Sequence, residues 1–404
     1  MPKGQIPEAL RLSTLTRLVN QDMQAPKTFF MGLVGTPVNY PSDSIEWESQ
    51  VGNMGMTPFV APGSVAPALA PSGVGQHSAK CAFWKEKMYM DEEWLNNMRR
   101  PGTIATYETA EMKMVRELAK MKNRCIRRRE WMCARMFTDG VLTYLTQGET
   151  KFTMSYGLPS EHMVTLSGDA RWEQGASPDM KGDFYDAKEA LSDAVGAAPT
   201  HVVFNSHTLR LMVEDSTVVS LLEKQAYGSG DLFSNPTAAL SRLFGVGNMV
   251  LYDEKFKVYA WITGLSSTLV TVDDISDFEA GATVRFINTK TGAYEDEVIA
   301  SVDQQNSQFT LVSAPTATFV AGRDRVVASK KYIPDNKIIF IANTVEGQKV
   351  AEFMQAPFGL DRHYGQKVDR HEEWDPEGIW LRIQDKGLPV LYRRDSIYIL
   401  THSS

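Results

Sequence analysis

Residues 103–146, TIATYETAEMKMVRELAKMKNRCIRRREWMCARMFTDGVLTYLT, decide the fold of this chain. They follow the breaker pair Pro101-Gly102 and contain no further proline or glycine until Gly140. Apolar side chains recur at steps of three and four, which is typical of an amphipathic helix. These side chains are Met114, Leu118, Met121, Cys125, Met132 and Met136. A single helix over 103–146 would extend about 60 Å, so we expect a strut that packs one face on a sheet.

The polar face of this predicted helix is strongly basic. Its cations are Lys113, Arg116, Lys120, Lys122, Arg124, Arg127, Arg128, Arg129 and Arg135, against the acids Glu111, Glu117 and Glu130. Two interpretations stay open: a solvated face, or salt bridges to acidic neighbouring subunits and contact with a polyanion. Because Arg128 and Arg129 interrupt the apolar seam, a coiled-coil dimer is disfavoured against packing on a sheet.

The overall composition is that of an ordinary soluble protein. The 404 residues carry a formal net charge of −7, with 23% charged and 43% hydrophobic residues, and this length suits two or three domains. No run approaches the roughly 18 apolar residues of a membrane span, so no membrane association is expected. Cys81, Cys125 and Cys133 have no metal-type spacing, so we expect buried thiols in a protein that folds in a reducing cytosol.

Residues 1–44 hold apolar side chains without a core for them. Prolines keep interrupting the pattern, and the apolar stretches Phe29-Phe30-Met31 and Leu33-Val34 have no local partner. We therefore interpret this segment as an arm whose apolar anchors are buried on something else, such as another subunit.

Residues 45–102 predict an extended hairpin. Strand patterns at 45–60 and 79–90 are joined by a loop rich in Pro, Gly and Ala. The hairpin is too small to form a core of its own, so its large apolar side chains need an outside surface. They are Trp84, Met88 and Tyr89.

The rest of the chain alternates between mixed and purely β patterns. Residues 185–264 show the helix and strand succession of a small mixed domain. They include a buried strand at 201–204, after which Asn205 or Ser206 is expected to cap a helix. Residues 265–330 change to short alternating strands, which predicts a small β-barrel or sandwich inserted into the parent domain. The parent pattern resumes at 331–360, and further strands are expected at 366–371, 379–384, 388–392 and 396–400.

Few residues suggest chemistry. One local group of histidines and acids occurs near the C-terminus: His363, His371, Glu372 and Glu373, with Asp361 and Asp369. This group lacks the spacing of a zinc site, so no metal, cofactor or catalytic residue is predicted. Trp172, with Asp169 and Glu173, could line a carbohydrate cleft, which leaves a glycan-active hydrolase as the enzymatic alternative.

Several stretches resemble the diffuse pattern of a known family. They are residues 198–205 with Leu209 and Leu211, 332–338, 376–380 and 387–399. In order and spacing they are similar to the HK97-fold major capsid proteins of tailed bacteriophages, in particular the family typified by the phage lambda major capsid protein. The resemblance covers nearly the whole chain except 265–330. That segment resembles the insertion domains that some phage capsid proteins carry on the outer side of the shell.

The resemblance implies an α+β, HK97-like capsid fold with an added small β-barrel. The implied parts are an N-terminal arm (1–44), an extended hairpin or E-loop (45–102), a peripheral domain (103–184 and 361–386) with its spine helix at 103–146, an axial domain (185–264, 331–360 and 387–404) and an insertion domain (265–330).

The implied function is that of a major capsid protein. Such a subunit self-assembles as pentamers and hexamers into an icosahedral shell that encloses double-stranded DNA without binding it specifically. The expected partners are further copies of the chain and the portal, scaffolding and decoration proteins of the same phage. Assembly is expected in the host bacterial cytoplasm, and the final location is the virion. The alternative within the structural class is a tail, baseplate or surface-array subunit.

Contacts between subunits are expected at two groups of side chains. The apolar group is Phe29, Phe30, Trp84, Met88 and Tyr89, and the basic group is Arg127, Arg128 and Arg129. We expect the arginines to pair mostly with carboxylates of the same or adjacent subunits.

Overall fold

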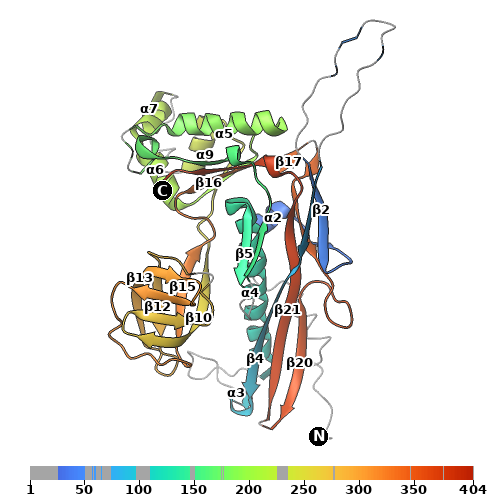
Figure 1. Cartoon of the computed structure of the whole chain (residues 1–404), viewed down its shortest axis with the longest axis vertical. Coiled ribbons are helices and arrows are strands. Elements are labelled where there is room, and N and C mark those ends of the chain that lie inside the picture. The colour runs from blue at the N-terminus through green and yellow to red at the C-terminus, as the bar shows by residue number, and fades with distance from the viewer. Residues whose placement is uncertain are drawn as a thin grey trace.

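A computed structural model of the chain describes residues 26–50, 57, 59–60, 65, 74–96, 110–145, 151–173, 175, 177–224, 235–275, 278–345, 347–375 and 377–403. In this part of the chain, a long sheet runs beside one long helix, a mixed lobe lies across their upper end, and a small barrel lies beside the helix (Figure 1). Residues 1–25 of the predicted arm, 103–109 of the predicted helix and most of 51–73 of the predicted hairpin lie outside the described residues.

The long helix, α4, spans Ala110–Asp139. Its predicted apolar seam is confirmed, because all six seam residues are buried. Met132 and Met136 belong to the main core cluster, and the other four pack in a second cluster with side chains of the long sheet. The cluster contains Met90, Met114, Leu118, Met121, Cys125, Val368, Leu381 and Ile383. At about 1.5 Å per residue the described helix extends about 45 Å.

The C-terminal end of the predicted helix is wrong. Helix α4 stops at Asp139, and Gly140 has a φ of 63°, a left-handed conformation that commonly ends helices. The next residues form strand β5 (Val141–Leu145), which pairs with β6 (Lys151–Ser155). β-branched and aromatic side chains in 141–145 favour this strand over another helical turn.

The basic face of α4 is not solvated along its whole length. Lys113 is only 4% exposed. Its Nζ donates to the Trp94 carbonyl at 3.1 Å and lies 5.3 Å from the centre of the Trp94 ring. Lys113 therefore fastens the N-terminal part of α4 to the short helix α3 (Glu92–Asn96).

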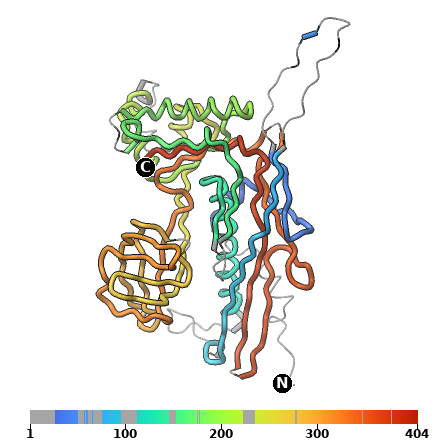
Figure 2. Tube along the Cα trace, viewed as in Figure 1, coloured from blue at the N-terminus to red at the C-terminus, as the bar shows by residue number. Residues whose placement is uncertain are grey.

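Strand β21 (Glu377–Leu391) is the centre of the long sheet. It pairs with β4 (Ala82–Asp91), β20 (Lys367–Trp374) and β19 (Ala351–Gln355). β1 (Val38–Asn39) adds to β19 in parallel. Figure 2 shows β4, from the early part of the chain, running beside β21 near its end. Since β21 continues unbroken past residue 386, residues 387–391 belong to this sheet and not to the axial lobe as predicted.

The predicted hairpin is formed by different strands. β2 (Ser44–Gln50) pairs with β3 (Val74–Lys80), and the chain then passes Cys81 into β4. The single strand predicted at 79–90 is therefore wrong. Its second part belongs to the long sheet, where the β21 backbone supplies the hydrogen bonds that a free hairpin would lack.

The upper lobe contains a five-stranded sheet of order β7-β22-β16-β8-β9 with helices packed against it (Figure 1). The predicted buried strand is confirmed as β8, and the Asn205 side chain caps the following helix by accepting from the Thr208 N–H at 3.1 Å. The strands are β7 (Met163–Thr165), β8 (His201–Phe204), β9 (Asn248–Leu251), β16 (Lys337–Ile341) and β22 (Ile397–Thr401). The helices are α5 (Met180–Val195), α6 (Ser206–Glu214), α7 (Ser216–Lys224) and α9 (Pro236–Phe244).

The inserted module is a closed barrel of order β10-β11-β14-β13-β12-β15. Its own apolar cluster includes Phe278, Phe286 and Phe309. The strands are β10 (Lys255–Ser266), β11 (Leu269–Val272), β12 (Thr283–Ile287), β13 (Tyr294–Asp303), β14 (Gln308–Leu311) and β15 (Arg325–Lys331). The barrel therefore begins at Lys255 and not at 265, because all of β10 takes part in it.

Short elements complete the described chain. They are α2 (Phe30–Val34), β17 (Thr344–Val345), β18 (Gln348–Lys349) and the 3-10 turns η2 (Ser160–His162), η3 (Gly168–Ala170) and η4 (Arg394–Ser396).

The barrel should fold by itself. Lys255 and Lys331 are paired in register across β10 and β15, so the two ends of the module lie side by side. A fragment of residues 253–332 should show a β-type circular dichroism spectrum and a cooperative thermal transition. Replacing that segment by a short Gly/Ser linker should leave the rest of the chain folded, since loop length costs little entropy. An unfolded fragment together with an insoluble deletion variant would show that the barrel belongs to the main core.

The seam of α4 should tolerate no charge. Leu118 is buried against the long sheet, so Leu118→Asp should lower the free energy of unfolding by several kcal/mol because the new carboxylate has no partner there. Lys120→Asp, at an exposed position of the same helix, is the matched control and should change it far less. Equal losses in urea unfolding would contradict the packing described.

Candidate functional site

The described residues hold no group of three or more His, Cys, Asp or Glu side chains that could bind a metal ion. Within the same part of the chain, no helix has the length and apolar character needed to cross a membrane. The thiols of Cys81, Cys125 and Cys133 are free and buried, as predicted. Burial raises the pKa of Cys81 and of Cys125 to about 12, which leaves them protonated and poor nucleophiles.

Trp172 lies in the core of the upper lobe. Its side chain is 5% exposed, its Nε1 donates to Asp183 Oδ2 at 2.7 Å, and its ring stacks on His402 at 5.0 Å between centroids. A ring covered in this way presents no face to a sugar, so the carbohydrate cleft considered from the sequence is wrong.

Phe29 and Phe30 pack within their own chain. Phe30 is 0% exposed, and its ring stacks on Phe137 of α4 at 5.7 Å and meets Tyr252 edge-on at 5.6 Å. Phe29 lies beside it and contacts Tyr252 at 5.9 Å. The prediction that these side chains lack a partner in this chain is wrong, because Phe137 and Tyr252 are distant in sequence but adjacent in the fold.

Glu130 fixes this part of the arm to α4. Its Oε1 accepts from the N–H groups of Phe29 at 2.9 Å and Phe30 at 3.0 Å, and its Oε2 accepts from the N–H of Met31 at 2.8 Å. These are the N–H groups at the start of α2, which have no partner inside a helix. A side chain from another element thus supplies the cap that the local sequence does not.

The same carboxylate also holds the neck of the barrel. The Tyr252 hydroxyl, between β9 and β10, donates to Glu130 Oε1 at 2.7 Å. The second neck residue, Tyr332, follows β15, and its ring lies 5.8 Å from that of Tyr252. Glu130 is 0% exposed. Burial raises the pKa of its carboxyl, and the N–H and hydroxyl donors oppose that rise.

Arg129, the preceding residue, points to the long sheet. Its Nε and Nη2 donate to the two oxygens of Asp385 at 2.7 and 2.8 Å, and both residues are buried. Its guanidinium also lies 5.3 Å from the centre of the Phe353 ring. The expectation of a carboxylate partner is confirmed for Arg129, and the partner belongs to the same chain, so Arg129 is not exposed for a neighbour.

The apolar residues of the predicted hairpin also find partners in the chain. Trp84 and Met88 are half-buried against the cluster between α4 and the long sheet. Tyr89 packs on Trp380 of β21 with ring centres 4.8 Å apart. The surface outside the hairpin that these residues need is thus the long sheet of the same chain. The predicted contact with another subunit is therefore wrong for the buried faces of these side chains.

Arg127 and Arg128 remain on the surface. Both are exposed and line a cleft of about 640 Å³ between α4 and β10. The Arg128 guanidinium lies 5.1 Å from the centre of the Trp131 ring. For these two residues the predicted contact with an adjacent subunit stays a prediction.

The arrangement joins separate parts of the chain at α4. Buried polar side chains join α4 to the arm, the barrel neck and the long sheet, while basic side chains face the cleft. The sequence reasoning missed Glu130, Tyr252 and Asp385 as joining residues. One signal was available for the arginine partner: Arg129 stands four residues after Cys125 and three before Met132, so it occupies the apolar seam itself.

Removing the Glu130 carboxylate should loosen the arm. Glu130→Ala leaves the three backbone N–H groups without this acceptor and removes the nearer of two acceptors of the Tyr252 hydroxyl. It should lower the free energy of unfolding by about 3 kcal/mol or more. Amide exchange at Phe29, Phe30 and Met31 should accelerate in parallel. Glu189→Ala, at an exposed position of α5, is the control and should stay within about 0.5 kcal/mol. Unchanged exchange at the three amides would contradict the role of Glu130.

Comparisons with known proteins show which proteins this chain resembles. Residues 11–316 match the sequence model of the family described as phage major capsid protein E. No curated protein matches the chain. The structure resembles a phage-related protein of Bordetella bronchiseptica RB50, with 11% identity, 96% of each chain covered and a TM-score of 0.50. The putative capsid protein of a prophage of E. coli CFT073 has 11% identity, coverage of 97% of this chain and 99% of that one, and a TM-score of 0.49.

Proposed function

This chain belongs to the phage major capsid protein E family, and we propose that its copies assemble as pentamers and hexamers into the icosahedral head of a tailed phage. It has an HK97-like capsid fold with an added six-stranded barrel, and it is a shell-forming protein of the virion. The observation that carries the proposal is the family match over 11–316, which covers most of the chain.

The geometry supports the same role. A shell subunit must resist internal pressure, and here one helix of 30 residues is fastened to a sheet centred on a strand of 15 residues. Segments that lie far apart in the sequence are joined at α4 through buried side chains. These buried contacts make the subunit rigid, so that neighbouring subunits can pack against its edges.

The contents of the shell are proposed to be double-stranded DNA, enclosed without specific recognition. The net charge of −7 fits a wall along which the duplex can slide during packaging, since tight phosphate binding requires many cations on the surface. Assembly is proposed to take place in the cytoplasm of a bacterial host. The partners are proposed to include portal, scaffolding and decoration proteins, and no enzymatic activity is proposed.

Expression of the full chain, alone and together with the neighbouring genes of its phage, tests this function. Electron microscopy should show closed, isometric shells in at least the second case, with subunits clustered in fives and sixes. Tubes, flat arrays or a subunit that stays monomeric in both cases would contradict a capsid role and favour a tail or surface-array protein.

A further inference from the structure

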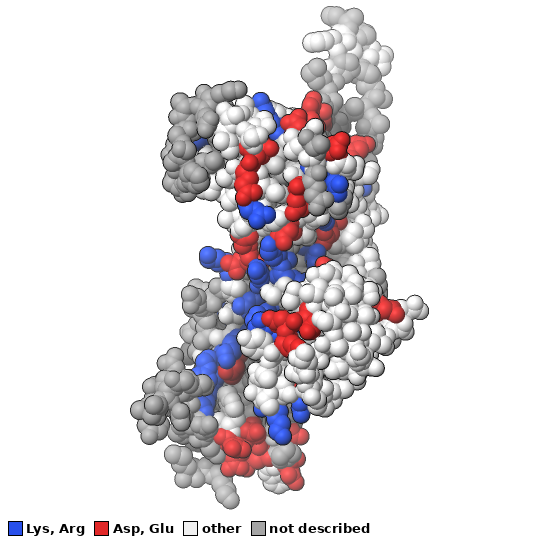
Figure 3. All heavy atoms as spheres, turned by 90° about the vertical axis from the view of Figure 1, so that its left-hand side faces the viewer, with Lys and Arg blue, Asp and Glu red and all other residues white. Residues whose placement is uncertain are grey.

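The cleft between α4 and β10 is lined by an unusual number of cations. They are Lys120, Arg124, Arg127, Arg128, Lys255 and Lys257, and one carboxylate, Asp274, lines it with them. Figure 3 shows Lys and Arg gathered on this side of the molecule, beside the barrel. The cleft volume of about 640 Å³ lies within the range of sites that enclose a ligand or a large side chain.

Four of these six cations form no ion pair with another described residue. Lys120 pairs with Glu117 at 2.7 Å and Arg124 with Glu86 at 2.8 Å. Among the described residues, no carboxylate lies within 4.0 Å of the charged nitrogens of the other four cations. Like charges held together in a partly enclosed cleft repel each other, and the positive electrostatic potential that they create there attracts anions. The cleft therefore favours an acidic partner.

The chain carries a matching acidic surface at the far end of the long sheet, which we call the acidic end. It contains Asp91, Glu92, Glu93, Glu372, Glu373, Asp375 and Glu377. Trp374 projects from it with 96% of its surface exposed. No ion pair joins Asp375 or Glu377 to another described residue. Tryptophan is among the residue types that most often anchor an interface.

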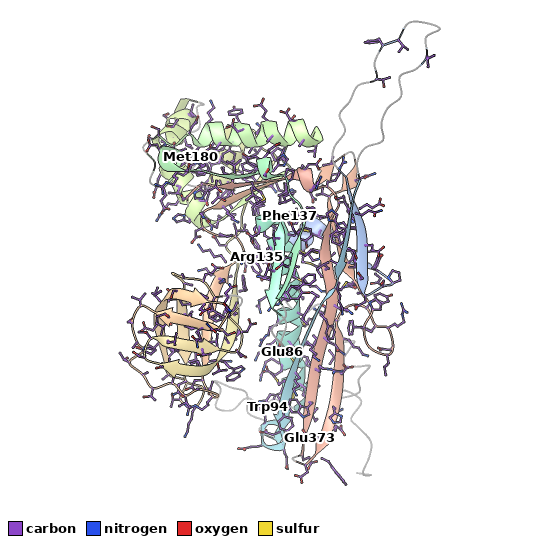
Figure 4. The ribbon with its side chains drawn as sticks, viewed as in Figure 1. Glu86, Trp94, Arg135, Phe137, Met180 and Glu373 are labelled. Atoms are coloured by element: carbon purple, nitrogen blue, oxygen red, sulfur yellow. The ribbon has the colours of Figure 1, made fainter. Side chains whose placement is uncertain are left out.

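The acidic end cannot reach the cleft of its own chain. Strands β20 and β21 stay paired up to Trp374 and Glu377, and β4 pairs with β21 up to Asp91, so the acidic end is held firmly. Figure 4 labels Glu373 and Trp94 at the lower end of the sheet and helix, with Glu86 above them. Lys113, which contacts Trp94, and Arg127 are separated by about 21 Å along α4.

We propose that the cleft receives the acidic end of a second copy of this chain. The carboxylates of Asp375 and Glu377 then meet Arg127, Lys255 and Lys257. Trp374 enters beside Arg128, where an indole face and a guanidinium attract each other. This contact rests on the proposed function, because it joins subunits of the shell. In this contact the barrel takes part in assembly, because its strand β10 forms one wall of the cleft.

Charge exchange in the full chain tests the contact. Arg127→Glu with Lys257→Glu should reduce the yield of shells about tenfold or more, and so should Asp375→Lys with Glu377→Lys. The chain that carries all four substitutions should recover most of the yield, because every copy then presents both reversed surfaces. Lys181→Glu with Lys290→Glu, at exposed positions elsewhere, is the matched control and should assemble normally. Circular dichroism should show that every variant folds.

A cysteine pair gives an independent readout. Trp374→Cys with Lys257→Cys should form disulfide-linked oligomers in oxidised shells and none in dissociated subunits. If wild-type shells form, but the charge variants assemble normally and no cross-link appears, the contact is overturned while the capsid function stands. Normal assembly of the cleft variant with loss of salt-sensitive DNA binding would overturn it in favour of a nucleic-acid surface. If the wild-type chain forms no shells, the proposed function itself fails, and this contact fails with it.

Discussion

The structure depends on two consecutive residues of α4 whose side chains point in different directions. Arg129 forms a buried pair with Asp385 of the long sheet, and Glu130 accepts hydrogen bonds from the arm and from the barrel neck. Successive helical residues differ by about 100° in direction, since a turn holds about 3.6 residues. One short segment can therefore hold elements on two sides of the helix. Removing either partner of a buried ion pair leaves the other charge uncompensated. The fold therefore needs both Arg129 and Asp385, and it needs Glu130 together with its hydrogen-bond donors.

The sequence allowed the helix seam, the upper-lobe strand β8 and the existence of a β insert to be predicted, because each is a local pattern. Period and capping express themselves within a few residues, as Asn205 capping α6 shows. The partners of long-range contacts could not be predicted in this way. Phe30 lacked a neighbour in the sequence, yet Phe137 and Tyr252 cover it in the fold. The same limit misplaced residues 387–391, because a strand's own pattern does not say which sheet receives it.

The basic residues of α4 have two different roles, one inside the subunit and one at its surface. A run of arginines could have meant DNA binding, but Arg129 is used inside the subunit. Arg127 and Arg128, two and one positions earlier, face the cleft beside the barrel. The subunit thus uses some of its cations to hold its own parts together and presents others at its surface. A shell protein needs both, since its strength depends on the stiffness of each subunit and on contacts between copies.

The most direct test of this account is a cryo-electron microscopy map of the assembled particle at side-chain detail. Every symmetry-independent subunit in a closed shell should keep the Arg129–Asp385 pair and the Glu130 contacts with Phe29, Phe30 and Tyr252, whatever its position in a pentamer or hexamer. The account would be contradicted by an open or helical assembly. It would equally be contradicted by closed shells in which the arm has left Glu130 or α4 has separated from β21.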